Sequence, residues 1–424
     1  MKVFETLESE VRFFIRGWPT VFKSGSGCHL YDTDGRKYID FFSGAGALNY
    51  GHNEPSMINA AIDYMRSDGI MHSLDMGTEA KAAFMQALHD TILQPRGLDY
   101  KLQFTGPTGT DAVEAALKLA RKVTGRQTVV SFVNGFHGVS LGALAVTSNR
   151  GKRRAAGVPL SNACIMPYDG GLGEGVSTVE YMEQLSSGAG TGWDEPAAVI
   201  VETVQGEGGL RMASREWLRQ LGEFCKRHGS LLIVDEIQTG CGRTGPFLSF
   251  EPSGIVPDIV CMSKSLSGFG APMALLLLKP EIDVWQPGDH VGTFRGFNQA
   301  FVAGKIALGF WAGGEFEQEI LAKGEIVRAS LNAIVDELPI LQTKVRGRGL
   351  LQGLYSPHKG FWLGVRDRAF QAGLVIHTSG ADAEAIRLMP PLNISRSDLQ
   401  AGIEILRQSI RAGAHDLEPP APRR

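Results

Sequence analysis

Short apolar runs alternate along the middle of the chain with segments that carry an apolar residue at every third or fourth position. The runs are rich in Val, Ile and Leu without polar alternation, which is typical of strands buried on both faces of a sheet. They are Thr128–Val133, Ala197–Val201, Leu231–Val234, Ile259–Met262 and Met273–Leu278. The segments between them, such as Asp111–Val123 and Arg215–His228, have the spacing of amphipathic helices. This alternation predicts an α/β fold with a mostly parallel sheet and helices on both faces.

The chain of 424 residues is longer than a single hydrophobic core usually supports, so we expect more than one domain. A long helical segment, Glu315–Leu338, opens a second stretch of α/β alternation. We predict an N-terminal segment over residues 1–45, a large domain over residues 46–310, and a smaller C-terminal α/β domain over residues 311–424 that packs with the N-terminal segment. The Gly/Ser-rich stretch Ser186–Gly192 predicts an exposed connection.

Composition and charge exclude several classes of partner. The net charge is -3 with acids and bases mixed, so neither nucleic acid nor an anionic membrane is expected as a partner. The five cysteines are scattered without zinc-site spacing, which favours a reduced protein without a metal. The first residues carry acids where a signal peptide needs an apolar run, and no apolar stretch is long enough to cross a bilayer. We therefore expect a cytoplasmic protein.

Ligands of parallel α/β sheets bind beyond the carboxyl ends of the strands, so the residues at those ends carry the candidate chemistry. The segment TGPTGTD, residues 105–111, lies directly before a helical pattern. Free N–H groups and the positive end of the helix dipole would make this segment a site for a phosphate. An ordinary helix cap by Thr110 fits the same residues equally well.

Four further residues suit one ligand, pyridoxal phosphate (PLP). Asp235 follows an apolar run, where a carboxylate needs a cationic partner such as a protonated pyridine nitrogen, and Gln238 could donate to a ring hydroxyl. Lys264 follows Ile259–Met262, and a lysine in a partly dry pocket becomes a nucleophile toward carbonyls. Phe136 offers a flat face for stacking. Taken singly, Asp235 is as consistent with a surface helix cap and Lys264 with a solvated side chain, but together they predict PLP held by Lys264 as a Schiff base.

Other cofactor and nucleophile classes lack their motifs. No G-x-x-x-x-G-K-[ST] loop is present, which argues against a P-loop nucleotidase. The glycine-rich stretch at residues 44–49 ends in Asn and opens no helical pattern, which argues against an NAD oxidoreductase. No G-x-S-x-G elbow is present, which argues against an α/β serine hydrolase.

Ten segments follow one another in a specific order: GCHLYDTDGRKYIDF, LNYGHNEP, GPTGTDAVEAALKLAR, NGFHG, ETVQGEGG, LLIVDEIQTGCGRTG, SKSLSGFGAP, GTFRGFN, VRGRGLLQGL and IRLMPPL. With these segments the chain resembles the class III (ornithine/acetylornithine-type) aminotransferases over nearly its whole length. The strings GAGALNYGHN, SDGIMHSLDM and LQPRGLDYK are similar to the ectoine-type branch of that family. The resemblance implies the PLP-dependent fold type I, with a large PLP-binding domain and a smaller C-terminal domain.

The resemblance also implies roles for single residues. Lys264 matches the Schiff-base lysine that shuttles the proton, and Asp235 matches the acid on the pyridine nitrogen. The other implied cofactor contacts are Gln238 at the phenolic oxygen, Phe136 stacked on the ring with His137 beside it, Glu202 near the cofactor, Gly109 and Thr110 at the phosphate, and Thr293 at the phosphate of the neighbouring subunit. Because Thr293 acts across subunits, the resemblance implies a homodimer with shared active sites, and whether two dimers form a tetramer is left open.

Substrate contacts follow from the same resemblance. Arg387 matches an arginine that grips a substrate carboxylate, and Glu207 matches the acid that gates it. Val139 stands where many members of the family have Arg or Lys reading the distal carboxylate. Arg295, in GTFRGFN, is our candidate for that task, although a plain surface role fits it as well.

The expected reaction is a reversible ping-pong transamination between an amino donor and a keto or aldehyde acceptor. The ectoine-type resemblance implies L-glutamate and L-aspartate 4-semialdehyde as substrates, giving 2-oxoglutarate and L-2,4-diaminobutyrate. The alternatives are ornithine, another diamino acid or a specialised-metabolite aldehyde as substrate, or a PLP mutase or racemase on the same fold. A PLP-fold binding protein without activity is a further alternative, against which the intact Lys264, Asp235 and Gln238 argue.

Overall fold

A computed structural model describes residues 1–173 and 175–415 of the chain. Its centre is a seven-stranded sheet in the order β4-β12-β11-β10-β7-β5-β6. The strands are β4 Lys101–Phe104, β5 Val129–Phe132, β6 Ala163–Met166, β7 Ala198–Val201, β10 Leu231–Asp235, β11 Ile259–Met262 and β12 Leu275–Leu278. Only β12 of these strands runs against the others, since it pairs antiparallel with both β11 and β4. The mostly parallel sheet that the apolar runs predict is therefore confirmed.

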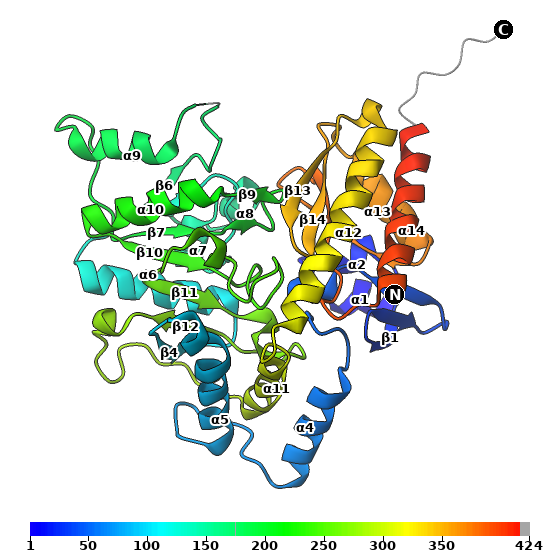
Figure 1. Cartoon of the computed structure of the whole chain (residues 1–424), viewed down its shortest axis with the longest axis horizontal. Coiled ribbons are helices and arrows are strands. Elements are labelled where there is room, and N and C mark those ends of the chain that lie inside the picture. Colours follow the sequence, from blue (N-terminus) through cyan, green and yellow to red (C-terminus); the bar gives the residue numbers. More distant parts are fainter. Residues whose placement is uncertain (174, 416–424) are drawn as a thin grey trace.

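Helices cover both faces of this sheet (Figure 1), and neighbouring residues of one strand belong to different apolar clusters. Ile233 of β10 lies in the same apolar cluster as the residues of α6, whereas Val234 lies in the cluster that contains α10. This burial on both faces explains the uninterrupted apolar runs. The helices of this part are α4 Pro55–Arg66, α5 Glu79–Leu88, α6 Gly109–Thr124, α7 Leu141–Val146, α8 Arg150–Arg154, α9 Thr178–Ser187, α10 Arg215–His228 and α11 Asn298–Gly309.

A second group of elements lies beside the central sheet, on the right in Figure 1. Its antiparallel sheet has the order β13-β14-β17-β16. The elements are α12 Glu315–Glu337, β13 Lys344–Arg348, β14 Leu351–Tyr355, α13 Phe361–Gln371, β15 Leu374–Val375, β16 His377–Ser379, β17 Ala385–Leu388 and α14 Arg396–His415. The long helix expected after residue 314 is thus confirmed, and it ends at Glu337.

The N-terminal residues pack with this second group. The strands β1 Phe22–Ser26, β2 His29–Asp32 and β3 Lys37–Asp40 form a sheet that β15 joins in parallel with β3. The remaining elements are α1 Lys2–Leu7, α2 Phe14–Gly17, α3 Ser43–Gly46, the two-residue strands β8 Val204–Gln205 and β9 Arg211–Met212, and the helical turns η1 His89–Leu93, η2 Gln94–Arg96, η3 Glu251–Ser253, η4 Lys264–Ser267, η5 Pro280–Ile282 and η6 Pro339–Leu341. The domain limits at residues 45 and 310 stay a prediction. None of the described helices has the length and apolar character needed to cross a membrane.

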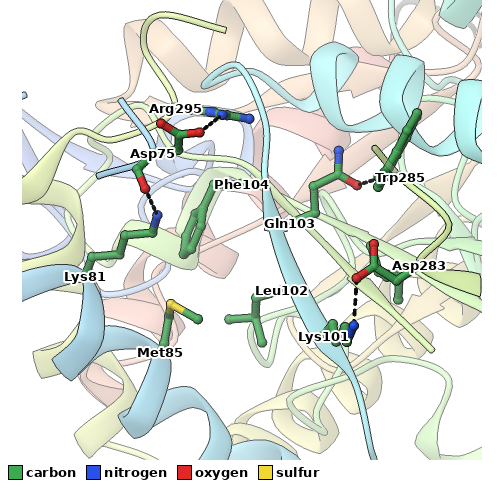
Figure 2. Close-up of a pocket in the computed structure, with 11 residues that line it drawn as sticks. Asp75, Lys81, Met85, Lys101, Leu102, Gln103, Phe104, Asp283, Trp285 and Arg295 are labelled. Carbon is green, nitrogen blue, oxygen red and sulfur yellow. Dashed lines mark hydrogen bonds and ion pairs between the residues drawn. The ribbon is translucent and has the colours of Figure 1, made fainter. Parts of the chain in front are cut away.

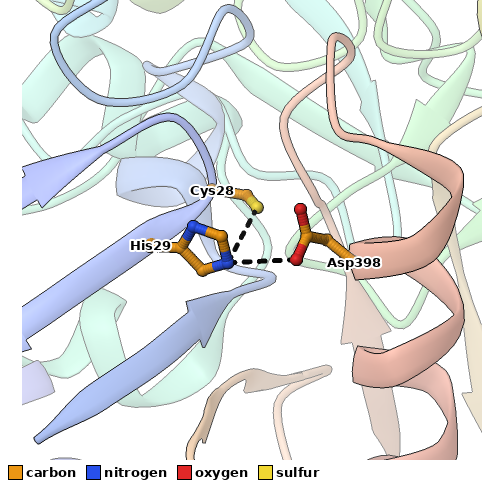
Figure 3. A group of neighbouring side chains, drawn as sticks. All are labelled: Cys28, His29 and Asp398. Carbon is orange, nitrogen blue, oxygen red and sulfur yellow. Dashed lines mark hydrogen bonds and ion pairs between the residues drawn. The ribbon is translucent and has the colours of Figure 1, made fainter.

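Three polar side chains join β2 to α14 (Figure 3). The Nε2 atom of His29 lies 3.1 Å from Oδ1 of Asp398 and 3.7 Å from Sγ of Cys28. Burial and the carboxylate of Asp398 raise the pKa of the Cys28 thiol to about 12. The thiol therefore stays protonated at neutral pH, and we interpret the three side chains as a hydrogen-bonded tie between the N-terminal segment and the last helix.

Arg243 joins three parts of the chain from a fully buried position. Its Nη2 atom donates to Oδ1 of Asn49 at 2.6 Å, and its Nη1 atom donates to the carbonyls of Leu350 and Pro390 at 3.1 and 2.5 Å. No carboxylate of the described residues forms an ion pair with it, and burial lowers its pKa to about 9. Three neutral oxygen atoms therefore hold the guanidinium, and none of them contacts another cation among the described residues.

We predict that Arg243→Met destabilises the protein strongly. The change leaves three buried acceptors unsatisfied, at a cost of about 3 kcal/mol or more in the free energy of unfolding. The midpoint of urea denaturation measures the effect. Arg66→Met is the matched control, because Arg66 is exposed and its nearest acid, Asp63, is 3.9 Å away. Equal midpoints for both variants would contradict the prediction.

Candidate active site

The loops at the carboxyl ends of the central strands meet the start of α6 at a cavity of about 250 Å³. Most of the site residues that the sequence predicts line this inner cavity. It is lined by Thr108, Gly109, Thr110, Phe136, His137, Gly138, Val139, Glu202, Glu207, Asp235, Ile237, Gln238, Thr239 and Lys264. The cavity thus lies where ligands of parallel α/β sheets bind.

The start of α6 forms one wall of the inner cavity. The N-cap is Thr108, whose Oγ1 accepts from the N–H of Asp111 at 3.3 Å, so the cap at Thr110 that the sequence suggested is wrong by two residues. The T-x-x-D spacing of Thr108 and Asp111 is a capping signal that could have identified it. A Cβ on Gly109 would lie 3.0 Å from Ile237, so only glycine leaves this turn uncrowded. The exposed N–H groups and the helix dipole make this wall suitable for an anion.

Asp235 forms a buried pair with His137 beneath the inner cavity. Its Oδ2 lies 2.8 Å from Nδ1 of His137, and its Oδ1 accepts from the N–H of Ile237 at 3.0 Å. Burial disfavours the charge on His137, but the carboxylate outweighs burial and raises the pKa of His137. The hydrogen bond to His137 fixes the carboxyl group of Asp235 at the end of β10, where it can accept a hydrogen bond from a cationic ring nitrogen.

Lys264 starts the helical turn η4 with a φ of 52°, in the left-handed region that residues with a side chain rarely adopt. Such strain often occurs at functional positions. Burial lowers the pKa of Lys264 to about 8, with the charge of Glu207 opposing the shift and that of Arg387 adding to it. A part of the lysine is therefore a neutral amine near neutral pH and can react with a carbonyl.

Glu207 and Arg387 form an ion pair beside the inner cavity, with Oε1 and Nη1 2.6 Å apart. The same Nη1 atom donates to the carbonyl of Gly206 at 2.7 Å and to Oε1 of Gln238 at 3.2 Å. Burial would raise the pKa of Glu207, but Arg387 and Lys264 lower it to about 2. The Nε atom of Arg387 is buried without a hydrogen-bond partner. Among the described residues, the hydrogen bonds of this guanidinium thus involve Nη1 and leave Nε unpaired.

Phe136 is positioned by a second buried acid. The N–H of Phe136 donates to Oε1 of Glu202 at 2.9 Å, and the N–H of Gly206 donates to the other oxygen at 3.2 Å. Burial raises the pKa of Glu202 to about 7. Glu202 therefore links the aromatic wall to the loop that carries Glu207.

Thr293 and Arg295 lie outside the inner cavity of their own chain. Arg295 forms an ion pair with Asp75 and donates to the carbonyl of His290 at 3.0 Å. Figure 2 shows Arg295 facing Asp75 at a separate pocket beside Phe104 of β4. The carbonyl of Thr293 lies 2.6 Å from Nε2 of His72. Within one chain, Arg295 does not reach the distal end of the inner cavity.

Residues 16–410 match the model of the family Aminotransferase class-III, and the chain therefore belongs to this family of PLP-dependent enzymes. Two similar relatives are named diaminobutyrate–2-oxoglutarate transaminase. The relative from Halalkalibacterium halodurans is 52% identical and covers 97% of this chain and 96% of its own length. The relative from Nocardia farcinica is 54% identical and covers 96% of this chain and 93% of its own length. The family predicted from the ten segments is confirmed.

Solved structures support the fold. A Bacillus anthracis aminotransferase matches with a TM-score of 0.86 at 24% identity, covering 97% of each chain. The ornithine aminotransferase of Toxoplasma gondii matches with a TM-score of 0.84 at 24% identity, covering 98% of this chain and 95% of its own. These likenesses confirm the PLP-enzyme fold that the motifs implied.

The inner cavity fits PLP on its own evidence. The open turn at Gly109 would accept a phosphate, Asp235 would face a ring nitrogen, and Lys264 would meet an aldehyde. Gln238, beside them, donates to the carbonyl of Ala45 at 3.0 Å. The lining residues therefore supply one partner for each polar group of the cofactor.

We predict that two substitutions move the pKa of Lys264 in opposite directions. Glu207→Gln removes a negative charge and should lower this pKa below about 8, whereas Arg387→Met removes a positive charge and should raise it. The pH dependence of amine labelling in the apoprotein, read at Lys264 by mass spectrometry, measures the pKa because only the neutral amine reacts. Labelling of the exposed Lys23 in the same digest is the control. Shifts of the same sign in both variants would contradict the assignment.

Proposed function

We propose that the protein transfers an amino group reversibly between L-glutamate and L-aspartate 4-semialdehyde, giving 2-oxoglutarate and L-2,4-diaminobutyrate. The observation that carries the proposal is the Glu207–Arg387 ion pair beside the amine of Lys264. A pocket that serves both substrates must bind a carboxylate next to the reacting carbon of glutamate. The same pocket must also accept diaminobutyrate, whose reacting terminal carbon has no carboxylate next to it. The printed name of the relatives supports this choice of substrates.

We assign the cofactor contacts as follows. When bound, PLP supplies an electron sink that stabilises negative charge at the reacting carbon of the substrate. Asp235, supported by His137, would hold the ring nitrogen protonated. The other contacts we propose are Gly109 and Thr110 at the phosphate, Gln238 at the phenolic oxygen, Phe136 against the ring, and Glu202 as the acid that holds the backbone of Phe136.

Lys264 is the group we propose for proton transfer. Its lowered pKa leaves a neutral amine that can take the proton from the reacting carbon and return it. The nearby charges of Glu207 and Arg387 act on this pKa in opposite directions, so their pairing keeps the net effect small. Lys264 therefore meets the main requirement for a general acid and base, a pKa close to neutral pH.

The pairing of Arg387 would change between the two half-reactions. Glutamate offers a carboxylate that can displace Glu207 from the guanidinium, where it would form the same kind of charge-assisted hydrogen bond that Glu207 now forms at Nη1. Diaminobutyrate reacting at its terminal amine offers none there, so Glu207 stays on Arg387. The acid thus prevents a buried, unpaired guanidinium, which would be costly.

The test of the function is turnover by the purified holoenzyme. We expect L-2,4-diaminobutyrate and 2-oxoglutarate to yield glutamate, measured by chromatography. Lys264→Ala should lower the rate by at least about a thousandfold because the proton-transferring amine is lost. Lys23→Ala, which changes an exposed lysine far from the inner cavity, should keep the rate. Turnover with ornithine but not diaminobutyrate would overturn the substrate assignment, and full activity in Lys264→Ala would overturn the mechanism.

We propose that the enzyme is a homodimer in which Thr293 completes the neighbouring site. Thr293 lies outside its own cavity, and apolar neighbours there are exposed, with Val291 at 67% and Phe294 at 66% exposure. Such a surface favours burial against a second copy. The donor and acceptor would then bind in two sites per dimer.

Hybrid dimers test this arrangement. Each site would combine Lys264 of one subunit with Thr293 of the other. In a dimer of one Lys264→Ala subunit and one Thr293→Ala subunit, one site therefore carries both changes and the other site is intact. Hybrids purified through two different tags should therefore show about half of the wild-type activity per dimer, well above either parent. Hybrids no more active than the Thr293→Ala parent would show that Thr293 does not act across subunits.

We also propose the cytoplasm as the place of action. All five cysteines are free thiols, and four of them are buried. Thiols of this kind persist in a reducing compartment.

A further inference from the structure

A second cavity, of about 480 Å³, lies next to the inner cavity, and two residues line both of them. The shared residues are Phe136 and Glu207. Other parts of this outer cavity are lined by Lys152, Arg366, His377 and Ser379. A substrate held at Lys264 with a long distal arm would therefore extend past Phe136 into the outer cavity.

Few arginine and lysine side chains line the two cavities or lie beside them. Arg387 serves the carboxylate next to the reacting carbon of glutamate in the function proposed above, on which this inference rests. Val139 on the inner wall carries no charge. In the outer cavity, Arg366 forms an ion pair with Asp367 at 2.7 Å. Lys152 has no ion pair among the described residues, and its Nζ lies 5.5 Å from the ring centroid of Phe136.

Hydrogen bonds fix the backbone at Lys152, whereas its ammonium group has no ion pair among the described residues. Oδ1 of Asn149 caps α8 by accepting from the N–H of Lys152 at 3.0 Å. The next residue, Arg153, donates to the carbonyls of Leu144, Ala145 and Thr147 at 2.9, 2.7 and 2.8 Å. The base of Lys152 is thus anchored to α7, and its exposed four-carbon side chain can reorient its charge toward a ligand.

We infer that Lys152 binds the substrate carboxylate that lies farther from the reacting carbon. That group is the γ-carboxylate of glutamate in one half-reaction and the α-carboxylate of diaminobutyrate in the other. Both groups are separated from the reacting carbon by further carbons of the chain, so both extend toward the outer cavity when that carbon lies at Lys264. A cation at the rim of Phe136 meets them without competing with Arg387. Lys152 is therefore a residue that selects substrates with a distal carboxylate.

The experiment compares glutamate with L-norvaline, which has the same number of carbons and no distal carboxylate. In holoenzyme with Lys152→Met, the ratio of kcat/KM for glutamate to that for norvaline should fall about tenfold, mainly through KM. Lys152→Arg should restore most of the ratio because it keeps the charge. Arg154→Met removes a charge from the same short helix without touching the outer cavity, and should leave the ratio unchanged.

Binding of glutarate provides a readout independent of turnover. Its Kd, measured by calorimetry on the holoenzyme, should rise about tenfold in Lys152→Met and stay unchanged in Arg154→Met. An unchanged ratio and an unchanged Kd in Lys152→Met would overturn this inference while leaving the transaminase proposal intact. Failure of the wild-type enzyme to use glutamate would instead overturn the function on which the inference rests.

Discussion

The ion pair between Glu207 and Arg387 is the interaction on which the candidate site depends, because it joins two separate parts of the fold. Glu207 follows the central strand β7, whereas Arg387 lies on β17 of the second sheet. The carbonyl of Gly206 and the amide of Gln238 bind the same guanidinium. If the two sheets shifted relative to each other, the inner cavity would lose both its arginine and the acid that neutralises it.

Burial makes the other charges of the inner cavity depend on one another. Desolvation lowers the pKa of Lys264 to about 8 and raises that of Glu202 to about 7, because burial disfavours the charged form of each group. Asp235, beside them, accepts hydrogen bonds from His137 and from the N–H of Ile237. Glu207 and Arg387 both act on the pKa of Lys264, so a single substitution in this group is expected to change more than one pKa.

The sequence predicts those parts of the site that follow directly from a buried strand. Asp235 and Lys264 could be placed because each comes at the end of an uninterrupted apolar run, and the carboxyl ends of such strands meet at one edge of the sheet. The strands β4 and β6 were missed. Lys101–Phe104 includes polar residues, and Ala163–Met166 is a partly buried strand at the edge of the sheet. The distance between Glu207 and Arg387 could not be predicted, because 180 residues separate them and only the packing of two sheets brings them together.

Lys152 shows a further limit of the sequence. Within the string RGKRRAAG it has the appearance of a solvated basic run, and nothing in the spacing distinguishes it from Arg153 or Arg154. The structure distinguishes the three residues. Arg153 donates hydrogen bonds to loop carbonyls, Arg154 does not line the outer cavity, and Lys152 does.

The outer cavity is also built from more distant segments than the inner one. Phe13 of the N-terminal segment lines it and packs edge-on against His377 of β16, with ring centroids 5.3 Å apart. The walls around the reacting carbon come mainly from the loops of one sheet, whereas the walls around the distal arm come from the N-terminal segment, α8 and the second sheet. Residues that line only the outer cavity, such as Lys152, can therefore change without altering the lining around Lys264 and Asp235, whereas Phe136 and Glu207 belong to both cavities. This separation assigns the carboxylate next to the reacting carbon and the distal carboxylate to different residues, Arg387 and Lys152, so the first can be absent while the second is still bound.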